Sequence, residues 1–170
     1  MIDQTVAARF QELLLEWAEE NEREFPWRDP EASLYKVFMS EMFLRRTRAD
    51  VVESFIPEFF ERYPDIASLR RADHKTLAET IRPMGLQNKR ASGLLELAQE
   101  IEGVGIPTDP EALAELPQVG PYVANATLCF ALDQQLPIVD RNVDRIYRRL
   151  FGDAWSDLDE TTQYEVAAGL

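Results

Sequence analysis

The chain has 170 residues, 45% of them hydrophobic, which suffices for one buried core or for two small lobes around a cleft. Its net charge of −13 disfavours a nucleic-acid partner, because such proteins usually carry a basic footprint. Its single cysteine excludes a disulfide framework and a four-thiolate site within these residues, and no apolar run approaches the roughly 20 residues of a membrane helix.

Helical patterns dominate the first sixty residues. Apolar residues at helical spacing predict a first helix: Val6, Phe10, Leu13, Leu14 and Trp17. Residues 25–30 break the pattern and predict a linker. Further apolar periodicity predicts helices over 34–44 and 51–60, with Pro57 bending the latter or marking a boundary.

The middle of the chain continues in the same way. Asp73 is a predicted N-cap of a helix that runs to about Arg82 and is stopped by Pro83 and Gly85. Another helix is predicted over residues 88–101, with glycines after it.

Three more helices and a helical segment over residues 161–170 complete the predicted elements. Thr108 followed by Pro110 predicts a helix start, and this helix stops at Pro117. Helices over about 121–132 and 141–151 follow. Because no stretch alternates convincingly, the predicted class is all-α with short connections.

The most informative motif lies between two predicted helices, where residues 116–122 read Leu-Pro-Gln-Val-Gly-Pro-Tyr. A tight hairpin with glycine lets backbone N–H groups approach a phosphate, and the next helix adds its positive N-terminal end. Four residues are therefore predicted to contact DNA: Leu116, Gln118, Val119 and Gly120. Taken alone, such a hairpin is more often an ordinary helix connection.

Several motifs together resemble one family. Residues 116–122, followed by Ile-Val-Asp-Arg-Asn-Val at 138–143, resemble the hairpin and catalytic aspartate of the endonuclease III and MutY superfamily of helix-hairpin-helix (HhH-GPD) DNA glycosylases. Residues 25–28, 40–47 and 84–91 resemble its upstream motifs in family order. The resemblance extends from about residue 7 to 165 and implies an enzyme that flips a base out of DNA and cuts its N-glycosidic bond.

Within the superfamily, Leu44-Arg45-Arg46-Thr47 resembles the Mig-type mismatch glycosylases, which remove thymine or uracil opposite guanine. Adenine-removing MutY enzymes typically have two glutamines at the arginine positions. Tyr122 stands where bifunctional members have a Schiff-base lysine, so the resemblance implies a monofunctional enzyme. Two alternatives remain: a MutY-type adenine glycosylase acting opposite guanine or 8-oxoguanine, and a DNA-binding module without activity.

Three residues are predicted to be catalytic. Asp140 would stabilise the cation that develops on the sugar, although it also fits an N-cap. Glu41 shares a helical face with apolar residues, so we expect a raised pKa and a proton for the departing base; the alternative is a surface glutamate paired with a basic neighbour. Tyr122 would contact the flipped nucleotide, or it is a rim residue.

Basic residues are the other predicted DNA contacts, although each alone also fits a solvated surface. The predicted set is Arg45, Arg46, Thr47, Lys89, Arg90 and Arg141. The only histidine, His74, is expected at the surface, and Cys129 in the core.

The resemblance also implies the architecture. A six-helix barrel with the hairpin is expected over residues 31–138, and a second lobe over 1–30 plus 139–170, with a DNA-binding cleft between them. The partner is expected to be double-stranded DNA with a mismatched or damaged base, in a reducing cytoplasm at the nucleoid.

Two departures from the family pattern stand out. Gln118 replaces the first hairpin glycine, which costs roughly 1 kcal/mol or more if φ is positive there. The family's four-cysteine iron–sulfur region would lie beyond Leu170, so we expect no cofactor within this chain except a monovalent cation at the hairpin, and no other metal. A truncated chain would expose apolar residues near Phe10, Leu14 and Trp17 and self-associate; a complete one would be a monomer.

The charge pattern reconciles acidity with DNA. Acidic residues crowd the first helix and residues 153–165, whereas the basic residues gather elsewhere. Such an acidic surface is a solubility device in concentrated salt, so a halophilic source is expected.

Overall fold

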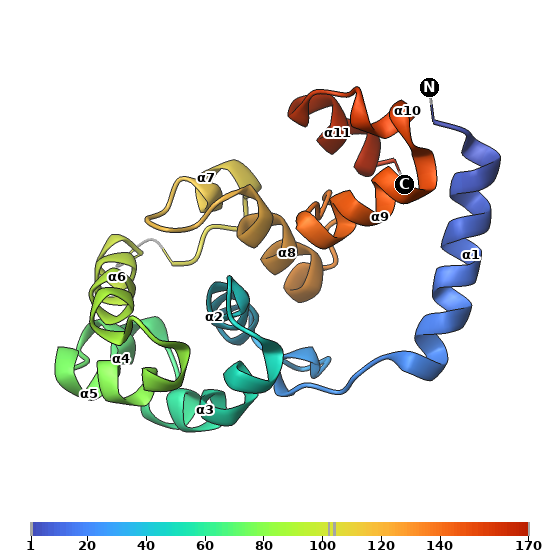
Figure 1. Cartoon of the computed structure of the whole chain (residues 1–170). Coiled ribbons are helices and arrows are strands. Elements are labelled where there is room, and N and C mark those ends of the chain that lie inside the picture. Colours follow the sequence, from blue (N-terminus) through green and yellow to red (C-terminus); the bar gives the residue numbers. More distant parts are fainter. Residues whose placement is uncertain (1, 102, 104, 170) are drawn as a thin grey trace. The chain divides into compact units, whose positions relative to one another are not determined.

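The computed structural model describes residues 2–101, 103 and 105–169, which are helical and contain no strand (Figure 1). This confirms the all-α class. The elements are α1 (Gln4–Asn21), η1 (Pro26–Arg28), α2 (Leu34–Leu44), α3 (Ala49–Arg62), α4 (Ile66–Arg70), α5 (His74–Thr80), η2 (Arg82–Met84), α6 (Gln87–Glu100), α7 (Pro110–Ala114), α8 (Pro121–Leu132), α9 (Arg141–Phe151), α10 (Asp153–Ser156) and α11 (Glu160–Ala167). Within this described part, no helix combines the length and apolarity needed to cross a membrane.

The chain divides into two compact units. Residues 25–134 form the first, here called the continuous unit, and residues 1–24 with 135–170 form the second, the split unit. The sequence placed the corresponding boundaries after residues 30 and 138. The hairpin and the helices η1 to α8 therefore belong to the continuous unit.

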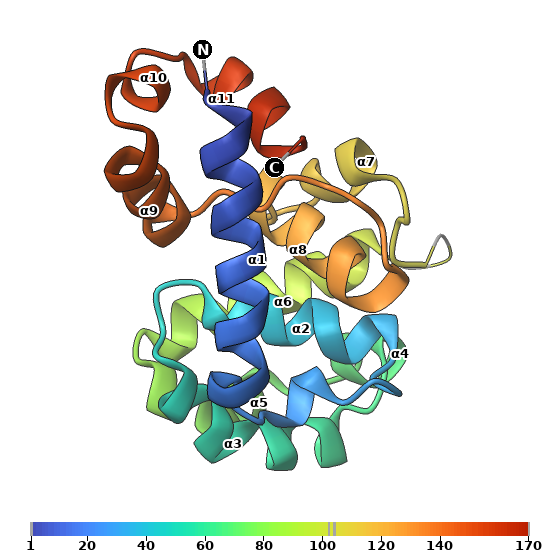
Figure 2. The ribbon, with the colours of Figure 1, turned by 90° about the vertical axis from the view of Figure 1, so that its right-hand side faces the viewer.

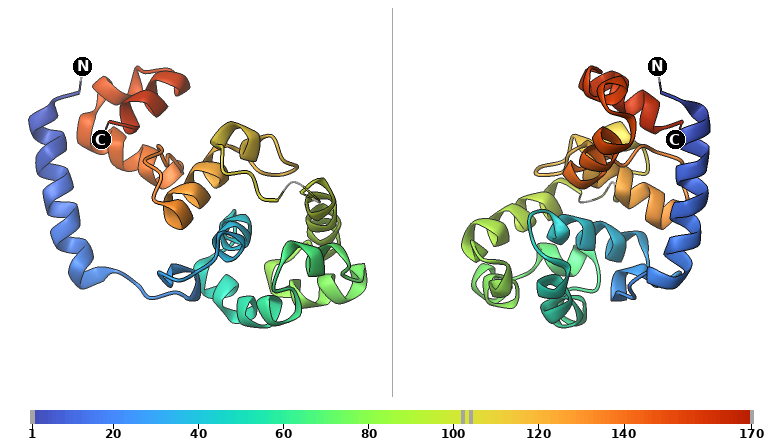
Figure 3. Two further views of the ribbon diagram at one scale, coloured as in Figure 1. Left: turned by 180° about the vertical axis from the view of Figure 1, so that it is seen from behind. Right: turned by 45° about the vertical axis from the view of Figure 1, so that its right-hand side comes forward.

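The core of the continuous unit is built around α2. Eight of its eleven residues are buried, and it packs against α3 and α8, as Figure 2 shows for α2 and α8. Phe43 contacts Phe55 and Phe59 of α3 edge to face. The helices α3 to α6 pack against one another in the same unit (Figure 3). A helix that is apolar on nearly every side has to be central, and this position fixes its few polar side chains.

Aspartate N-caps determine where several helices begin. The Asp73 side chain accepts a hydrogen bond from the Thr76 N–H at 2.9 Å, as the sequence predicted. The start predicted at Thr108 is wrong by one residue, because Asp109 accepts from the Ala112 N–H and is the cap. The helix expected to reach Arg82 ends at Thr80, and the chain continues as the 3-10 turn η2.

Pro57 lies inside α3 and not at a boundary. Its ring is exposed, whereas Phe55, Ile56 and Phe59 around it are buried. Burial of this apolar face keeps the helix continuous through a residue that lacks an N–H donor.

The split unit has its own small core. Trp155 of α10 is fully buried, its indole N–H donates to Asp144 at 3.0 Å, and its ring meets Tyr147 of α9 edge to face. In α1, by contrast, the apolar residues Leu13, Leu14, Leu15 and Trp17 are exposed. Phe10 of the same helix is half-buried.

Candidate active site

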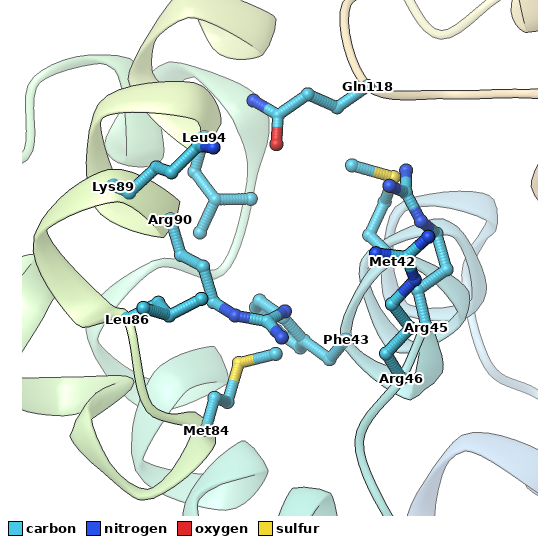
Figure 4. Close-up of a pocket in the computed structure, with 10 residues that line it drawn as sticks. All are labelled: Met42, Phe43, Arg45, Arg46, Met84, Leu86, Lys89, Arg90, Leu94 and Gln118. Carbon is cyan, nitrogen blue, oxygen red and sulfur yellow. The ribbon is translucent and has the colours of Figure 1, made fainter.

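One cavity of about 380 Å³ lies within the continuous unit, and Figure 4 shows its walls. It is bounded by the end of α2, the turn from η2 into α6, and the hairpin before α8. Its lining, here called the cation pocket, consists of Met42, Phe43, Arg45, Arg46, Met84, Leu86, Lys89, Arg90, Leu94 and Gln118.

The cation pocket gathers four positive charges and no acidic side chain. Arg45 and Arg46 come from the end of α2, and Lys89 and Arg90 from the first turn of α6. Burial, and then the charges of Arg45 and Arg46, lower the pKa of the Arg90 guanidinium below its usual range. Uncompensated cations of this kind favour a ligand that is anionic or rich in acceptor atoms.

Backbone strain is concentrated around this pocket. Among the described residues, four non-glycine residues have a left-handed φ, and three of them line it: Arg46 at 57°, Leu86 at 51° and Gln118 at 63°. The fourth is Asp133. Such conformations cost free energy and cluster at ligand sites, where the surrounding structure enforces them. The strained residues and the positive charges therefore indicate the same ligand site.

Glu41 is the buried carboxyl of α2. Only 5% of its surface is exposed, and burial raises its pKa to about 7, with the Arg28 charge acting in the opposite direction. The raised pKa was predicted from its apolar helical face, and the alternative of a surface glutamate is wrong because the side chain is buried. Arg45 of the cation pocket follows one helical turn later.

The hairpin connects α7 to α8. The Val119 N–H donates to the Leu116 carbonyl at 3.0 Å, which closes the turn, and Gly120 is the N-cap of α8. A Cβ at Gly120 would meet nothing within 4 Å, so the side of the residue that a side chain would occupy is open. The backbone has room there for a ligand that approaches closely. Tyr122 is half-buried in the first turn of α8.

Asp140 belongs to the split unit, where it is the N-cap of α9. One carboxylate oxygen accepts from the Asn142 and Val143 N–H groups, both at 2.8 Å, and the other accepts from the Asn142 side chain at 2.9 Å. The N-cap interpretation is therefore confirmed, and the catalytic role remains a prediction. Arg141 is the exposed first residue of α9.

The structure thus unites five predicted site residues in one pocket: Arg45, Arg46, Lys89, Arg90 and Gln118. Thr47 does not line it. Four of its apolar lining residues, Met42, Phe43, Met84 and Leu86, lie in the family-like segments 40–47 and 84–91, but none was predicted as a site residue. In the structure Leu86 is unusually exposed for an apolar side chain, at 73%. Cys129, predicted in the core, is only half-buried, because it lies near the end of α8.

Metal and cofactor ligands are scarce. Within the described ranges, no three His, Cys, Asp or Glu residues lie close enough to hold a metal ion. One cysteine does not supply the four thiolates of an iron–sulfur cluster, so these residues do not fit that group. The hairpin offers backbone carbonyls, of which Leu116 already accepts a hydrogen bond, and a monovalent cation there stays a prediction.

Proteins of known sequence and structure resemble most of this chain. A thymine-DNA glycosylase of Aeropyrum pernix is 40% identical over 146 residues, which cover 82% of this chain and 64% of that protein. A thymine/uracil-DNA glycosylase of Methanothermobacter thermautotrophicus is 34% identical over 143 residues, covering 81% and 63%. The solved structure of a thermostable thymine-DNA glycosylase has a TM-score of 0.91 at 29% identity, covering 98% of this chain and 78% of that one.

The chain spans less than two thirds of the length of both relatives. Residues 39–169 match the family described as HhH-GPD superfamily base excision DNA repair protein. This match includes Glu41, the cation pocket, the hairpin and Asp140, and it confirms the resemblance found in the sequence. The chain belongs to the HhH-GPD superfamily of base excision DNA repair proteins.

Proposed function

We propose that this chain is a monofunctional DNA glycosylase that hydrolyses the N-glycosidic bond of thymine or uracil opposite guanine in duplex DNA. The observation that carries the proposal is Glu41, a buried carboxyl with a pKa of about 7, one turn from a pocket of four cations. The printed names of the thymine and thymine/uracil glycosylases support the choice of base.

The chemistry follows from where charge develops. When the bond between sugar and base breaks, the sugar becomes positive and the base leaves with the electron pair. Protonated Glu41 supplies a proton to the departing base, and a pKa near 7 keeps that proton available at neutral pH. The hydroxide part of a water adds to the sugar carbon, and the remaining proton restores Glu41.

Asp140 takes the other half of the reaction in this proposal. A carboxylate beside the sugar stabilises the developing cation and orients the water. The hydrogen bonds from Asn142 and Val143 hold this carboxylate in one orientation. Tyr122 contacts the flipped nucleotide and, having no amine, forms no Schiff base with the abasic sugar.

DNA binding rests on two features of the continuous unit. The cations of the pocket attract phosphate or acceptor-rich base edges, and the hairpin presents backbone N–H groups at Gly120. These contacts position the duplex without reading a long sequence, which suits an enzyme that searches for a wrong base pair.

A panel of duplexes tests the proposal. Under single-turnover conditions at several salt concentrations, we expect base release from T·G and U·G pairs and none from matched duplexes. Release of adenine opposite guanine or 8-oxoguanine, with none of thymine or uracil, would establish the adenine glycosylase instead. Binding to mismatched DNA without any release would establish the inactive binding module.

Borohydride trapping tests the monofunctional assignment. With Tyr122 at the position of the Schiff-base lysine, we expect intact abasic product and no covalent protein–DNA complex. A trapped complex at stoichiometric yield would show that another amine attacks the sugar.

A further inference from the structure

Gln118 is an exposed residue whose side chain lies against Gly93 of α6. A Cβ built at Gly93 would lie 1.6 Å from the Gln118 Nε2, 2.6 Å from its Cδ and 2.8 Å from its Oε1. The carboxamide therefore occupies space that any other residue at position 93 would fill. Gly93 lies inside α6, where glycine is unfavourable relative to alanine.

Gln118 itself carries a second local cost. Its φ of 63° is left-handed, a conformation that disfavours any residue with a side chain. Two residues with unfavourable local conformations or propensities, Gln118 on the hairpin and Gly93 in α6, thus together determine where the Gln118 amide lies. Local rules broken in a coordinated way are expected at functional sites.

The amide supplies what the cation pocket otherwise lacks. Of the ten lining residues, four are cations and five are apolar, so Gln118 contributes the one carbonyl oxygen from a side chain. Figure 4 shows this carboxamide reaching into the pocket from the hairpin, across from Arg90. The pocket can therefore accept hydrogen bonds at one point and donate them at several others.

Guanine has hydrogen-bonding groups that match both the arginines and the Gln118 carbonyl oxygen of this pocket. Its O6 and N7 are paired acceptors suited to an arginine, and its N1–H and N2–H groups are adjacent donors suited to a carbonyl oxygen. Adenine lacks the O6 acceptor, and thymine lacks the pair of adjacent donors. Arg45 or Arg46 together with Gln118 thus complements guanine better than the other bases.

We propose that Gln118 is a specificity-determining residue, whose carbonyl oxygen accepts hydrogen bonds from the unpaired guanine left opposite the excised base. This inference rests on the proposed glycosylase function. Gly93 is a positioning residue, because its lack of a Cβ leaves the space that the amide occupies. One neutral hydrogen bond of this kind corresponds to about 3- to 10-fold in affinity.

The test replaces guanine by inosine, which lacks only the 2-amino group. Dissociation constants are measured for T·G and T·I duplexes in which a 2′-fluorinated target nucleotide prevents cleavage, and single-turnover rates for the unmodified duplexes. Wild-type protein should prefer guanine by about 3- to 10-fold. In Gln118→Leu the guanine preference should be about 3- to 10-fold lower than in wild type. The two proteins are compared on the same two duplexes, so the weaker T·I pair cancels from this comparison.

Two further variants separate recognition from folding. Gln118→Gly relieves the left-handed φ, so it should fold at least as stably as wild type and still lose the preference. Gly93→Ala displaces the amide without changing a pocket side chain and should lose the preference too. Gln99→Leu, an exposed glutamine of α6 away from the pocket, is the matched control and should keep it.

The outcomes are distinct. If wild type prefers guanine and both Gln118 variants keep that preference, or if wild type has none, the inference is overturned while base release still supports the proposed function. If wild type neither binds nor cleaves any mismatched duplex, the proposed function fails and the inference fails with it.

Discussion

At the scale of single residues, Glu41 combines a buried carboxyl with a raised pKa. Its folded-state pKa of about 7 exceeds the ordinary 4.5, so the folded protein retains a proton that the unfolded chain releases between these values. The contribution of this carboxyl to folding is therefore neutral below pH 4.5 and becomes increasingly unfavourable up to about pH 7.

Glu41→Gln should accordingly gain stability relative to wild type as the pH rises. The amide has no charge to bury, so the difference in unfolding free energy should grow by about 3 kcal/mol between pH 4.5 and 7. Urea unfolding of both proteins across this range measures it. Glu61→Gln, on an exposed part of α3, is the control, and a constant difference for Glu41→Gln would contradict the burial argument.

Asp140 has a structural and a proposed chemical role, and two substitutions separate them. Asparagine is an equally good N-cap, so Asp140→Asn should keep the stability of α9 but reduce base release at least 100-fold for want of the carboxylate charge. Asp140→Ala loses the cap as well and should unfold about 1 kcal/mol more easily. Thermal melts and single-turnover assays report the two effects. Near wild-type release by Asp140→Asn would refute the catalytic assignment.

At the scale of elements, α3 contains an interior proline whose ring does not contribute to the core. Pro57 lies in its ninth position and is exposed, so its ring packs into no core. Interior proline removes one helix hydrogen bond and crowds the preceding turn. The helix nevertheless forms because its apolar face is buried between neighbours.

Pro57→Ala should therefore stabilise the protein. We expect the unfolding free energy to rise by about 1–3 kcal/mol, the lower end reflecting the greater freedom of the unfolded chain. Chemical denaturation gives the value. The mirror substitution Ser54→Pro, also exposed and interior to α3, should destabilise by a comparable amount, and a neutral Pro57→Ala would mean that the helix is already adapted to the ring.

At the scale of the molecule, the charge of −13 coexists with a basic pocket. Four of the acids, Glu12, Glu16, Glu19 and Glu20, are exposed along α1, which belongs to the other unit. Crowded carboxylates repel one another, and salt screens this repulsion.

Stability should therefore increase with salt. We expect the melting temperature to rise as KCl increases into the molar range, while DNA affinity falls because counterions compete for the cations of the pocket. Calorimetry and fluorescence anisotropy measure the two trends on the same protein. A melting temperature that falls steadily with KCl would remove the argument for a high-salt habitat.

Local features of the sequence predicted a large part of this structure. The N-caps Asp73 and Asp140 and the start of α8 at Pro121 follow from hydrogen bonds and ring constraints within one helical turn, so neighbouring residues suffice to predict them. The sequence showed that Gln118 stands at a glycine position of the resembling hairpin but left its φ open, and the structure gives it a left-handed φ of 63°. The helices α4 and α10 escaped prediction, because four or five residues are too few to show a helical period.

Only the tertiary structure decided which of these residues meet. The end of α2, the first turn of α6 and the hairpin are far apart in sequence, and no local pattern shows that Arg45, Arg90 and Gln118 line one pocket. Nor does any local pattern show that Gly93 is small because an amide from the hairpin fills its place. Local propensity fixes backbone conformation over a few residues, whereas such contacts depend on how helices far apart in the sequence bury their apolar faces in one unit.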